Sequence, residues 1–443
     1  MRFDLSKDVA RIAEEWNQVI FDKEQAHDFD IDLYGPKGSG KTKAAQELAN
    51  SHAGIYYVSF EGLSYDDAVR SFVCAYLPGN EDISSISDAV DCFLKKISGK
   101  RTLIIVESEN SDAMREFLSR FPIHDKRKSI IFCFIRNEQY NLDHAVRMWH
   151  RSPAEFIKAF PEYNNNDAMR LQALTGGMMA VAKELDQEAS YEDNVRRLLR
   201  FDSAFSTHLP AMLNQCFRTP ESYYPIIKSM ADGHCRLSEI AKGIGFPNNK
   251  CLNYIEALIE NGFAEAQKLE GSKQSTYHLA NSYYSAWGRY VYGKKMLQIS
   301  GPDNLFQHVS EDIDEHITIP AFCDACLRFF RESRKEYLFE YRWSDVKEIK
   351  KAVAVKISDG STVTIDYVIK TDKFDFNLIF PHAIDMKYTK EEINRVYEAL
   401  DIIDSRYYAH TTVFSFTRFS DWCVEEAARN EWFHIVPVER LKY

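Results

Sequence analysis

The stretch GPKGSGKT at residues 35–42 decides the fold of the N-terminal part of this sequence. It fits the pattern G-x-x-x-x-G-K-[ST] at every defined position. The apolar run Ile31 to Tyr34 precedes it, and the run Lys41 to Asn50 is rich in helix-forming residues. We therefore expect a strand to enter the loop and a helix to leave it. A loop at such a junction is suited to bind the phosphates of a nucleotide at the helix N-terminus.

Each residue type in this loop has a chemical reason. Gly35, Gly38 and Gly40 allow backbone conformations and close approaches that a Cβ atom would block, so that successive N–H groups can surround a polyphosphate. We expect Lys41 to reach the β- and γ-phosphates of ATP and the Thr42 hydroxyl to bind the bridging Mg²⁺. The alternative is a glycine-rich turn that binds no ligand. The expected nucleotide-binding residues are Gly35, Pro36, Lys37, Gly38, Ser39, Gly40, Lys41 and Thr42, with ATP and Mg²⁺ as cofactors.

Three more strand-like runs follow the loop, at Gly54 to Phe60, Arg101 to Val106 and Ser129 to Ile135. Helix-compatible segments separate them, which predicts a parallel sheet with right-handed crossovers. Ligands of such sheets lie beyond the carboxyl ends of the strands. We therefore interpret residues 1–152 as an α/β nucleotide-binding domain.

Polar residues stand at the carboxyl ends of two of these runs. We expect Glu107 to hold the metal and Glu109 to polarise the attacking water; the alternative is solvated charge at a strand end. Asn137 is the candidate sensor of the γ-phosphate, and the alternative is an asparagine that caps a loop. These three residues are the catalytic candidates.

Length and composition bound the possible functions. The 443 residues predict about two to four domains. With a net charge of −11, any contact with nucleic-acid phosphates must come from a local patch. Apolar runs fall far short of the roughly 20 residues that cross a bilayer, so we expect a cytoplasmic protein without a membrane partner. Nine cysteines, an odd number, fit buried thiols better than a disulfide framework.

The middle of the chain predicts two helical modules. Residues 153–205 are expected to form a small lid behind the nucleotide domain. Residues 206–295 contain three helical stretches, at Tyr223 to Ser229, Leu237 to Gly243 and Asn248 to Asn261, followed by two strand-like pieces, which predicts a winged helix-turn-helix domain. Its third helix offers three asparagines and a lysine to DNA, but its charge is low. DNA contact and a regulatory or protein-contacting role both remain open.

The C-terminal part, residues 296–443, is rich in β-structure. The β-rich pattern starts at Leu338 and follows a helix at Ile319 to Arg331, and the order of a helix, three strands, a helix and a strand is that of restriction-endonuclease-like folds. We expect strands at residues 351–358, 362–371, 374–380, 383–388, 412–417 and 434–438, with helices at 390–403 and 421–431.

Three residues in this part form a candidate nuclease site. The motif of these folds places an Asp on the second strand and (D/E)-x-K on the third, and Asp366, Asp385 and Lys387 occupy those places. Alternation along a strand would put Asp385 and Lys387 on one face, where two carboxylates bind Mg²⁺ and the lysine helps to activate a metal-bound water. The alternative is a retained fold without cleavage.

Taken together, the phosphate-binding loop, lid, winged helix and endonuclease-like tail resemble the prokaryotic and archaeal ATPases of the STAND branch of the AAA+ superclass whose C-terminal domain is nuclease-like. Stretches such as SPAEFIKAFP at residues 152–161 and YHLANSYYSAW at residues 277–287 also resemble this family. The resemblance covers nearly the whole chain. It implies a P-loop NTPase that uses ATP and Mg²⁺ and has a DNA-related output.

Three departures from the family pattern bear on activity. Glu107 and Glu109 replace the usual adjacent Asp-Glu pair of the Walker B motif, and Arg136-Asn137 replaces a small-residue signature. Both departures put hydrolysis in doubt. Cys323 stands where the family usually carries a Glu before the nuclease core, which puts cleavage in doubt.

Three hypotheses follow from the sequence. The leading one is an ATP-binding switch with slow hydrolysis and a DNA-related role. The second is an ATP-controlled, metal-dependent endonuclease that uses Asp366, Asp385 and Lys387. The third is a nucleotide-sensing scaffold without turnover. A protein partner or a homo-oligomer is compatible with each of them.

Overall fold

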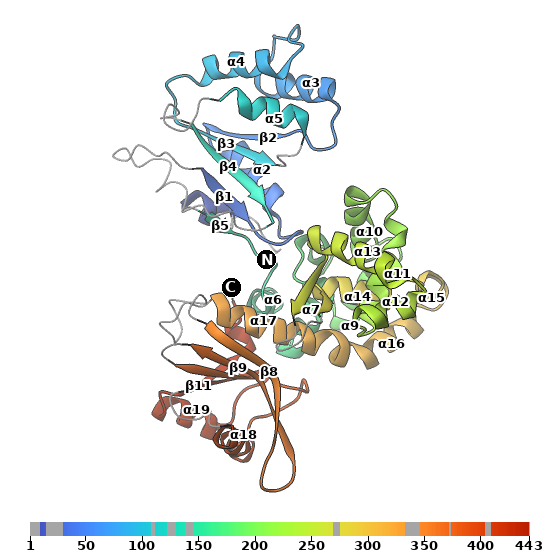
Figure 1. Cartoon of the computed structure of the whole chain (residues 1–443), viewed down its shortest axis with the longest axis vertical. Coiled ribbons are helices and arrows are strands. Elements are labelled where there is room, and N and C mark those ends of the chain that lie inside the picture. The colour runs from blue at the N-terminus through green and yellow to red at the C-terminus, as the bar shows by residue number, and fades with distance from the viewer. Residues whose placement is uncertain are drawn as a thin grey trace. The chain divides into compact units, whose positions relative to one another are not determined.

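The structure is a computed structural model that describes residues 9–14, 30–107, 111–121, 130–137, 145–268, 275–332, 346–371, 374–403 and 409–442. Contacts within the chain divide it into two compact units, Phe3–His150 and a unit that contains Arg151–Tyr443, each of which is described by itself (Figure 1). In the described residues, no helix combines the length and the apolar character needed to cross a bilayer.

The first unit is built on a parallel five-stranded sheet in the order β2-β3-β4-β1-β5. The four predicted strands are confirmed to within one residue at each end; the three-residue β5 is too short for its sequence pattern to predict it. Its strands are β1 (Ile31–Tyr34), β2 (Ile55–Ser59), β3 (Thr102–Glu107), β4 (Ile130–Arg136) and β5 (Ala145–Arg147), and its helices are α2 (Lys41–Ser51), α3 (Tyr65–Tyr76), α4 (Ile86–Ile97) and α5 (Asp112–Ser119).

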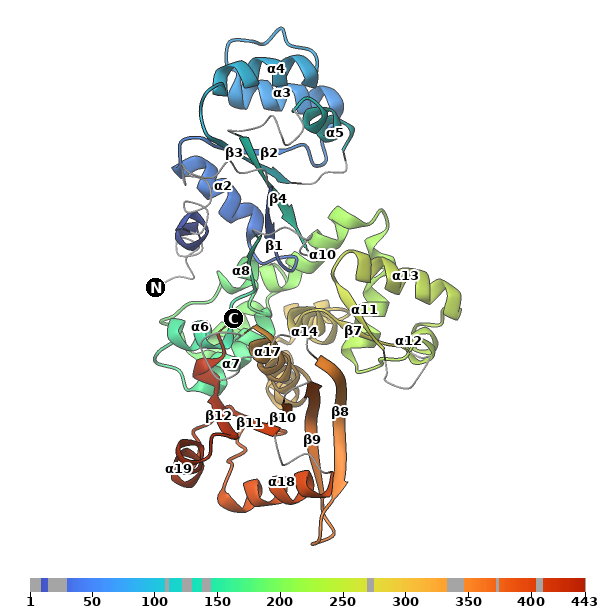
Figure 2. The same cartoon turned by 60° about the vertical axis from the view of Figure 1, so that its left-hand side comes forward.

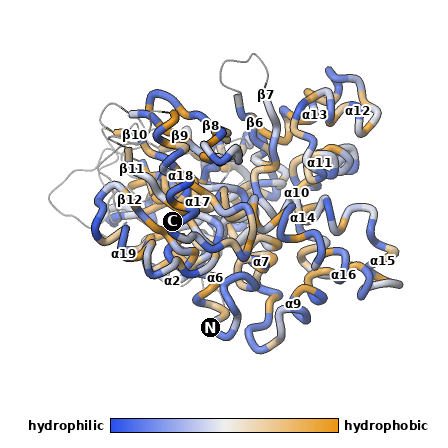
Figure 3. Tube along the Cα trace, turned by 90° about the horizontal axis from the view of Figure 1, so that it is seen from below, coloured by the Kyte–Doolittle hydropathy of each residue, from blue (hydrophilic) through white to orange (hydrophobic). Residues whose placement is uncertain are grey.

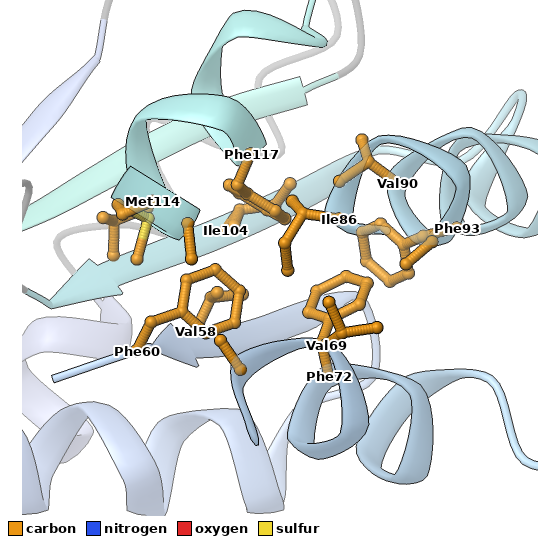
Figure 4. Packing of buried hydrophobic residues seen from close by; sticks show 14 of the residues in the cluster. Val58, Phe60, Val69, Phe72, Ile86, Val90, Phe93, Ile104, Met114 and Phe117 are labelled. Atoms are coloured by element: carbon orange, nitrogen blue, oxygen red, sulfur yellow. The ribbon is translucent and has the colours of Figure 1, made fainter. Parts of the chain in front are cut away.

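Both faces of this sheet are covered, as expected for parallel strands made of nearly continuous apolar runs. Along β3, Ile104 and Val106 belong to a core cluster that includes residues of α3, α4 and α5, whereas Leu103 and Ile105 belong to a second cluster with residues of α2. Figure 4 shows the first cluster, in which aromatic rings of the helices meet the sheet. The alternation of β3 thus fixes which side chains face α2.

The second unit begins with five helices, four of which lie in the predicted lid region, while the fifth begins at its end and continues into the next predicted domain. Three of them have a polar N-cap side chain that accepts a hydrogen bond from the first turn, at Asn164, Ser190 and Ser203. Figure 3 shows hydrophobic and hydrophilic residues mixed along the helices of this unit. In α9, the hydrophobic Val195 and Leu198 are buried and most of the other residues are hydrophilic, as expected for a helix that is buried on one side. The helices are α6 (Pro153–Ala159), α7 (Asn165–Thr175), α8 (Met179–Ala182), α9 (Tyr191–Leu198) and α10 (Ala204–Cys216).

The next segment contains the three helices and two strands predicted for a winged helix. Gly245 ends the second of these helices in the left-handed conformation, which lets the chain turn into the third. The two strands pair in antiparallel fashion. The elements are η2 (Pro220–Ser222), α11 (Tyr224–Ala231), α12 (Leu237–Ile244), α13 (Asn248–Glu260), β6 (Ala264–Lys268), β7 (Ser275–Leu279), α14 (Ser282–Tyr290) and α15 (Lys295–Ser300).

The C-terminal part holds a second five-stranded sheet in the order β12-β11-β10-β9-β8 (Figure 2). Phenylalanines of α17 pack against Phe376, Phe414 and Phe416 of the sheet region. Residues of α18 belong to a separate hydrophobic cluster that also contains residues of β8 and β9. The elements are α16 (Pro302–Ile313), the π-helix η3 (Asp314–Thr318), α17 (Ile319–Glu332), β8 (Val346–Lys356), β9 (Thr362–Thr371), β10 (Asp375–Ile379), α18 (Lys390–Ile402), β11 (Ala409–Ser415), α19 (Asp421–Arg429), β12 (Phe433–Pro437) and η5 (Val438–Arg440).

One strand prediction in this part is wrong. Residues 383–388 form a turn and an irregular segment instead of a strand, with the Met386 N–H donating to the Ala383 carbonyl at 3.2 Å. β10 already pairs with β9 on one side and with β11 on the other, and Pro381, which has no N–H to donate, follows its end. The period-two alternation of Asp385 and Lys387 therefore does not place them together on a strand.

Candidate functional site

The loop between β1 and α2 has the conformation that its glycines predict. Gly38 and Gly40 have φ angles of 83° and 92°, and Gly40 is the N-cap of α2 in the left-handed region. At Gly35, a Cβ atom would lie 1.9 Å from the Met148 carbonyl oxygen, so only glycine fits between the loop and the segment after β5. The loop is therefore held against the edge of the sheet.

Lys41 points back into this loop. Its ammonium group donates hydrogen bonds to the carbonyl oxygens of Gly35 at 2.7 Å and Pro36 at 2.9 Å, and the residue is 8% exposed. Burial lowers the pKa of Lys41 to about 8, although the nearby Glu107 carboxylate opposes this shift. The loop thus holds a positive charge that is only partly neutralised, which is the electrostatic setting a polyphosphate requires.

Thr42 and Glu107, which the sequence assigns separately to the metal, lie together. The Thr42 hydroxyl donates a hydrogen bond to Oε1 of Glu107, and the Tyr57 hydroxyl donates one to Oε2. Glu107 is the last residue of β3, beyond the core of the sheet, while Thr42 is in the first turn of α2. A hydroxyl beside a carboxylate at this position supplies the oxygen ligands that Mg²⁺ prefers.

The remaining loop residues also suit an anionic ligand. The Ser39 hydroxyl is buried and has no hydrogen-bond partner among the described residues, so a phosphate oxygen would satisfy it. The Lys37 carbonyl oxygen lies 2.9 Å from Nε2 of the buried His150, which anchors the outer part of the loop. The donors present in the loop therefore fit the phosphates of a nucleotide.

The other catalytic candidates are less well placed. Asn137 follows β4 directly and is exposed. Its neighbour Arg136 pairs at 3.0 Å with Asp32, a fully buried carboxylate on β1, so that this arginine ties the two strands together. Glu109 lies outside the described residues.

The C-terminal candidates are not brought together. On β9, Asp366 accepts a hydrogen bond from the Phe380 N–H at 2.7 Å, and Nε2 of His382 lies 3.7 Å from its other oxygen. Burial raises the pKa of Asp366 to about 6. Asp385 and Lys387 are exposed in the segment after β10. In the described part of the chain, no three His, Cys, Asp or Glu residues form a group that could hold a metal ion.

Cys323 occupies the helix α17 position where the resemblance implies a glutamate. Burial raises the pKa of its thiol well above the usual range, and the nearby Asp366 and Asp324 carboxylates add to the shift. The thiol therefore favours its neutral form, unlike the carboxylate that the resemblance implies at this position. Cys326, one turn further along, is fully buried, whereas Cys323 is of intermediate burial.

Tyr57 and His150 are site residues that the sequence analysis misses. The alternation of β2 and β3 contains a signal for Tyr57: it pairs in register with Ile105, so that Tyr57, Ile105 and Glu107 share the face covered by α2. That signal requires the strand register, which the sequence does not specify. His150 comes close to the loop only because β5 lies beside β1.

Comparison with known proteins does not name a family. No family model and no curated protein matches the sequence. A solved chain of Drosophila ORC bound to DNA is 11% identical, with 64% of this chain and 86% of that chain covered and a TM-score of 0.29. PCH-2 of C. elegans is 11% identical, with coverages of 57% and 68% and a TM-score of 0.23. Protein VC1899 of Vibrio cholerae is 10% identical, with coverages of 93% and 95% and a TM-score of 0.21.

TM-scores this low do not establish a shared fold. The chain's own geometry, a parallel sheet with the glycine-rich loop between β1 and α2, is the arrangement typical of a P-loop nucleotide-binding domain.

Proposed function

We propose that the chain binds ATP with Mg²⁺ in the loop at residues 35–42 and hydrolyses it slowly, as a nucleotide-controlled switch. The observation that carries this proposal is the buried Lys41 ammonium in a glycine-lined loop, beside the contact between Thr42 and Glu107. A bound polyphosphate would stabilise this partly desolvated positive charge by direct electrostatic contact.

The residues divide the work of binding. The backbone N–H groups after Gly38 surround the phosphates at the N-terminus of α2, and Lys41 exchanges its two carbonyl partners for phosphate oxygens. Thr42 and Glu107 hold the metal. When bound, Mg²⁺ neutralises the charge of the phosphates and polarises the transferred group.

Slow turnover follows from the acidic residues. Glu107 has both carboxylate oxygens hydrogen-bonded, so it serves the metal better than it serves as a general base. The adjacent residue is Ser108 in place of a second acid, and the remaining candidate for activating water is Glu109. We therefore infer that nucleotide occupancy, more than rapid hydrolysis, is the output of the site.

At the level of family, we propose a STAND-class AAA+ ATPase with a DNA-related role. The three helices and the hairpin at residues 224–279 support a winged helix in the second unit. Asn248, Asn249, Lys250 and Asn253 are exposed on α13, the helix that would contact DNA. Lys250 lies over the Phe246 ring, 4.2 Å from its centroid, so one cation on this face is already held in place.

Replacement of Lys41 tests the proposal directly. Lys41→Ala removes the buried charge and should weaken ATP binding by at least about tenfold, because a charge-assisted phosphate contact contributes about 1.5–3 kcal/mol. Lys43→Ala is the matched control, since the Lys43 side chain is 69% exposed on the first turn of the same helix. Calorimetry with full-length protein gives both affinities. Equal ATP affinity in wild type and Lys41→Ala would overturn the assignment.

A second candidate function, a metal-dependent endonuclease, is favoured by Asp366. This residue lies on the second strand of the C-terminal sheet, mostly buried beside His382, with the raised pKa given above. Nicking of a supercoiled plasmid with Mg²⁺ or Mn²⁺, with and without ATP, tests this function. Cleavage lost in Asp366→Asn would support it, and cleavage unchanged in that variant would assign the activity to a contaminant.

A further inference from the structure

Glu107 is held at two points instead of one. Its Oε1 accepts from the Thr42 hydroxyl on α2, and its Oε2 accepts from the Tyr57 hydroxyl on β2. A glutamate has one more rotatable bond than an aspartate, so without a second contact its carboxylate has more ways to point away from the metal. The hydrogen bond from Tyr57 restricts the extra rotation that a glutamate has in place of the usual aspartate.

Tyr57 is itself well fixed. Its backbone carbonyl accepts a hydrogen bond from the Tyr76 hydroxyl on α3, in addition to the ladder that pairs β2 with β3. The strand alternation directs its side chain to the α2 face, where it packs against the second core cluster.

We propose that Tyr57 is a positioning residue for the metal: by holding Oε2 of Glu107 it keeps Oε1 at the Thr42 hydroxyl, where the Mg²⁺ of bound ATP is expected. This inference rests on the proposed function. It assigns Tyr57 no contact with the nucleotide. Residues that orient a metal ligand in this way typically change metal affinity by about 10–100-fold when they are replaced.

The test compares two neighbouring tyrosines of β2. Tyr57→Phe removes the hydroxyl that reaches Glu107 and that also meets the side chains of Gln46 and Ser59. Tyr56→Phe removes a hydroxyl from the next residue, whose ring lies on the opposite face of the strand, 4.9 Å from the Phe93 ring centroid. ATP affinity is measured by calorimetry in EDTA, and metal affinity of the ATP complex is measured by titration with Mn²⁺ followed by electron paramagnetic resonance.

We expect Tyr57→Phe to bind ATP normally in EDTA but to need about tenfold more Mn²⁺ for half-saturation, while Tyr56→Phe behaves as wild type. Thermal unfolding of each variant shows whether it is folded. A second series in the Glu107→Ala background separates positioning from general structure. There, Tyr57→Phe should have no further effect, because no carboxylate remains to be held.

Two results would overturn the inference while leaving the proposed function intact. One is an unchanged Mn²⁺ titration in Tyr57→Phe. The other is an equal loss of Mn²⁺ affinity from Tyr57→Phe with and without Glu107, which would show that the hydroxyl does not act through that carboxylate. Absence of ATP binding by wild type, with or without metal, would overturn the proposed function and this inference together.

Discussion

Raising the pH through about 8 is expected to weaken ATP binding, because Lys41 then loses the charge that contacts the phosphates. Burial lowers the pKa of Lys41 from 10.5 to about 8 in the free protein. A depressed lysine pKa means that the neutral form is favoured in the folded loop, so protonation must accompany ATP binding above that pH. A lysine with its ordinary pKa would remain charged throughout this range.

The magnitude follows from the fraction of protein that carries the charge. At about pH 8 half of the Lys41 side chains are protonated, and at about pH 9 about one in eleven is, so the apparent Kd should rise about fivefold over that unit. Each further pH unit should raise the apparent Kd about tenfold, until only the affinity of the form with neutral Lys41 remains.

Calorimetry of ATP binding between about pH 7 and pH 10 measures this profile. Repeating it in buffers of different ionisation enthalpy counts the protons taken up. Lys41→Arg is the control, because the arginine guanidinium does not titrate in this range. The ATP affinity of this variant should therefore not change with pH. A flat wild-type profile with no proton uptake would refute the reasoning, since it would mean that the Lys41 charge is not lost or does not matter.

Three further predictions concern stability, two of them in the first unit and one in the second. Gly35→Ala should abolish ATP binding and destabilise the first unit in chemical denaturation, since the new Cβ meets the Met148 carbonyl oxygen at 1.9 Å. Gly62→Ala is the control, because Gly62 has a positive φ but open space around it. This variant should lower the unfolding free energy by only about 1–3 kcal/mol and leave ATP binding unchanged. Asp366→Asn should raise the unfolding free energy near neutral pH by up to about 3 kcal/mol, because a carboxyl pKa raised from 3.8 to about 6 makes the ionised form unfavourable in the folded state. That gain should shrink as the pH falls from about 6 to about 4 and should be absent below about 4, where the carboxyl is protonated in both the folded and the unfolded state. A gain independent of pH would contradict the cause given. Phe93→Ala, which empties a fully buried ring position, should cost about 3–5 kcal/mol in urea denaturation, and a loss below about 1 kcal/mol would show that this core can rearrange.

Much of the first unit could be predicted from sequence because its signals are local. The strands β1 to β4 are mostly apolar runs, interrupted in β1 by the buried Asp32, and such runs in a parallel sheet are buried on both faces wherever they pair. The loop requires positive φ angles at Gly38 and Gly40, which the sequence provides without reference to any distant residue. The helix caps of the second unit are local in the same sense.

The C-terminal site shows where local signals fail. Residues 383–388 alternate like a strand, but β9 and β11 already occupy both sides of β10, and the alternation has no partner to pair with. Asp385 therefore lies in a turn, while His382, which no motif indicates, lies beside Asp366. Strand order is a property of the whole sheet, and a period of two in six residues cannot specify it.

By itself, the sequence determined that a glycine-rich loop with the residue pattern of a phosphate-binding loop joins a strand to a helix at residues 35–42, since this depends on backbone freedom and on the residue types at fixed spacing. Only the tertiary structure decided that the Lys41 charge is partly desolvated and that Glu107 is shared between Thr42 and Tyr57. Desolvation and hydrogen bonding depend on which groups meet in space. Between Tyr57 and Glu107 that meeting spans 50 residues of chain and is set by the register of β2 against β3.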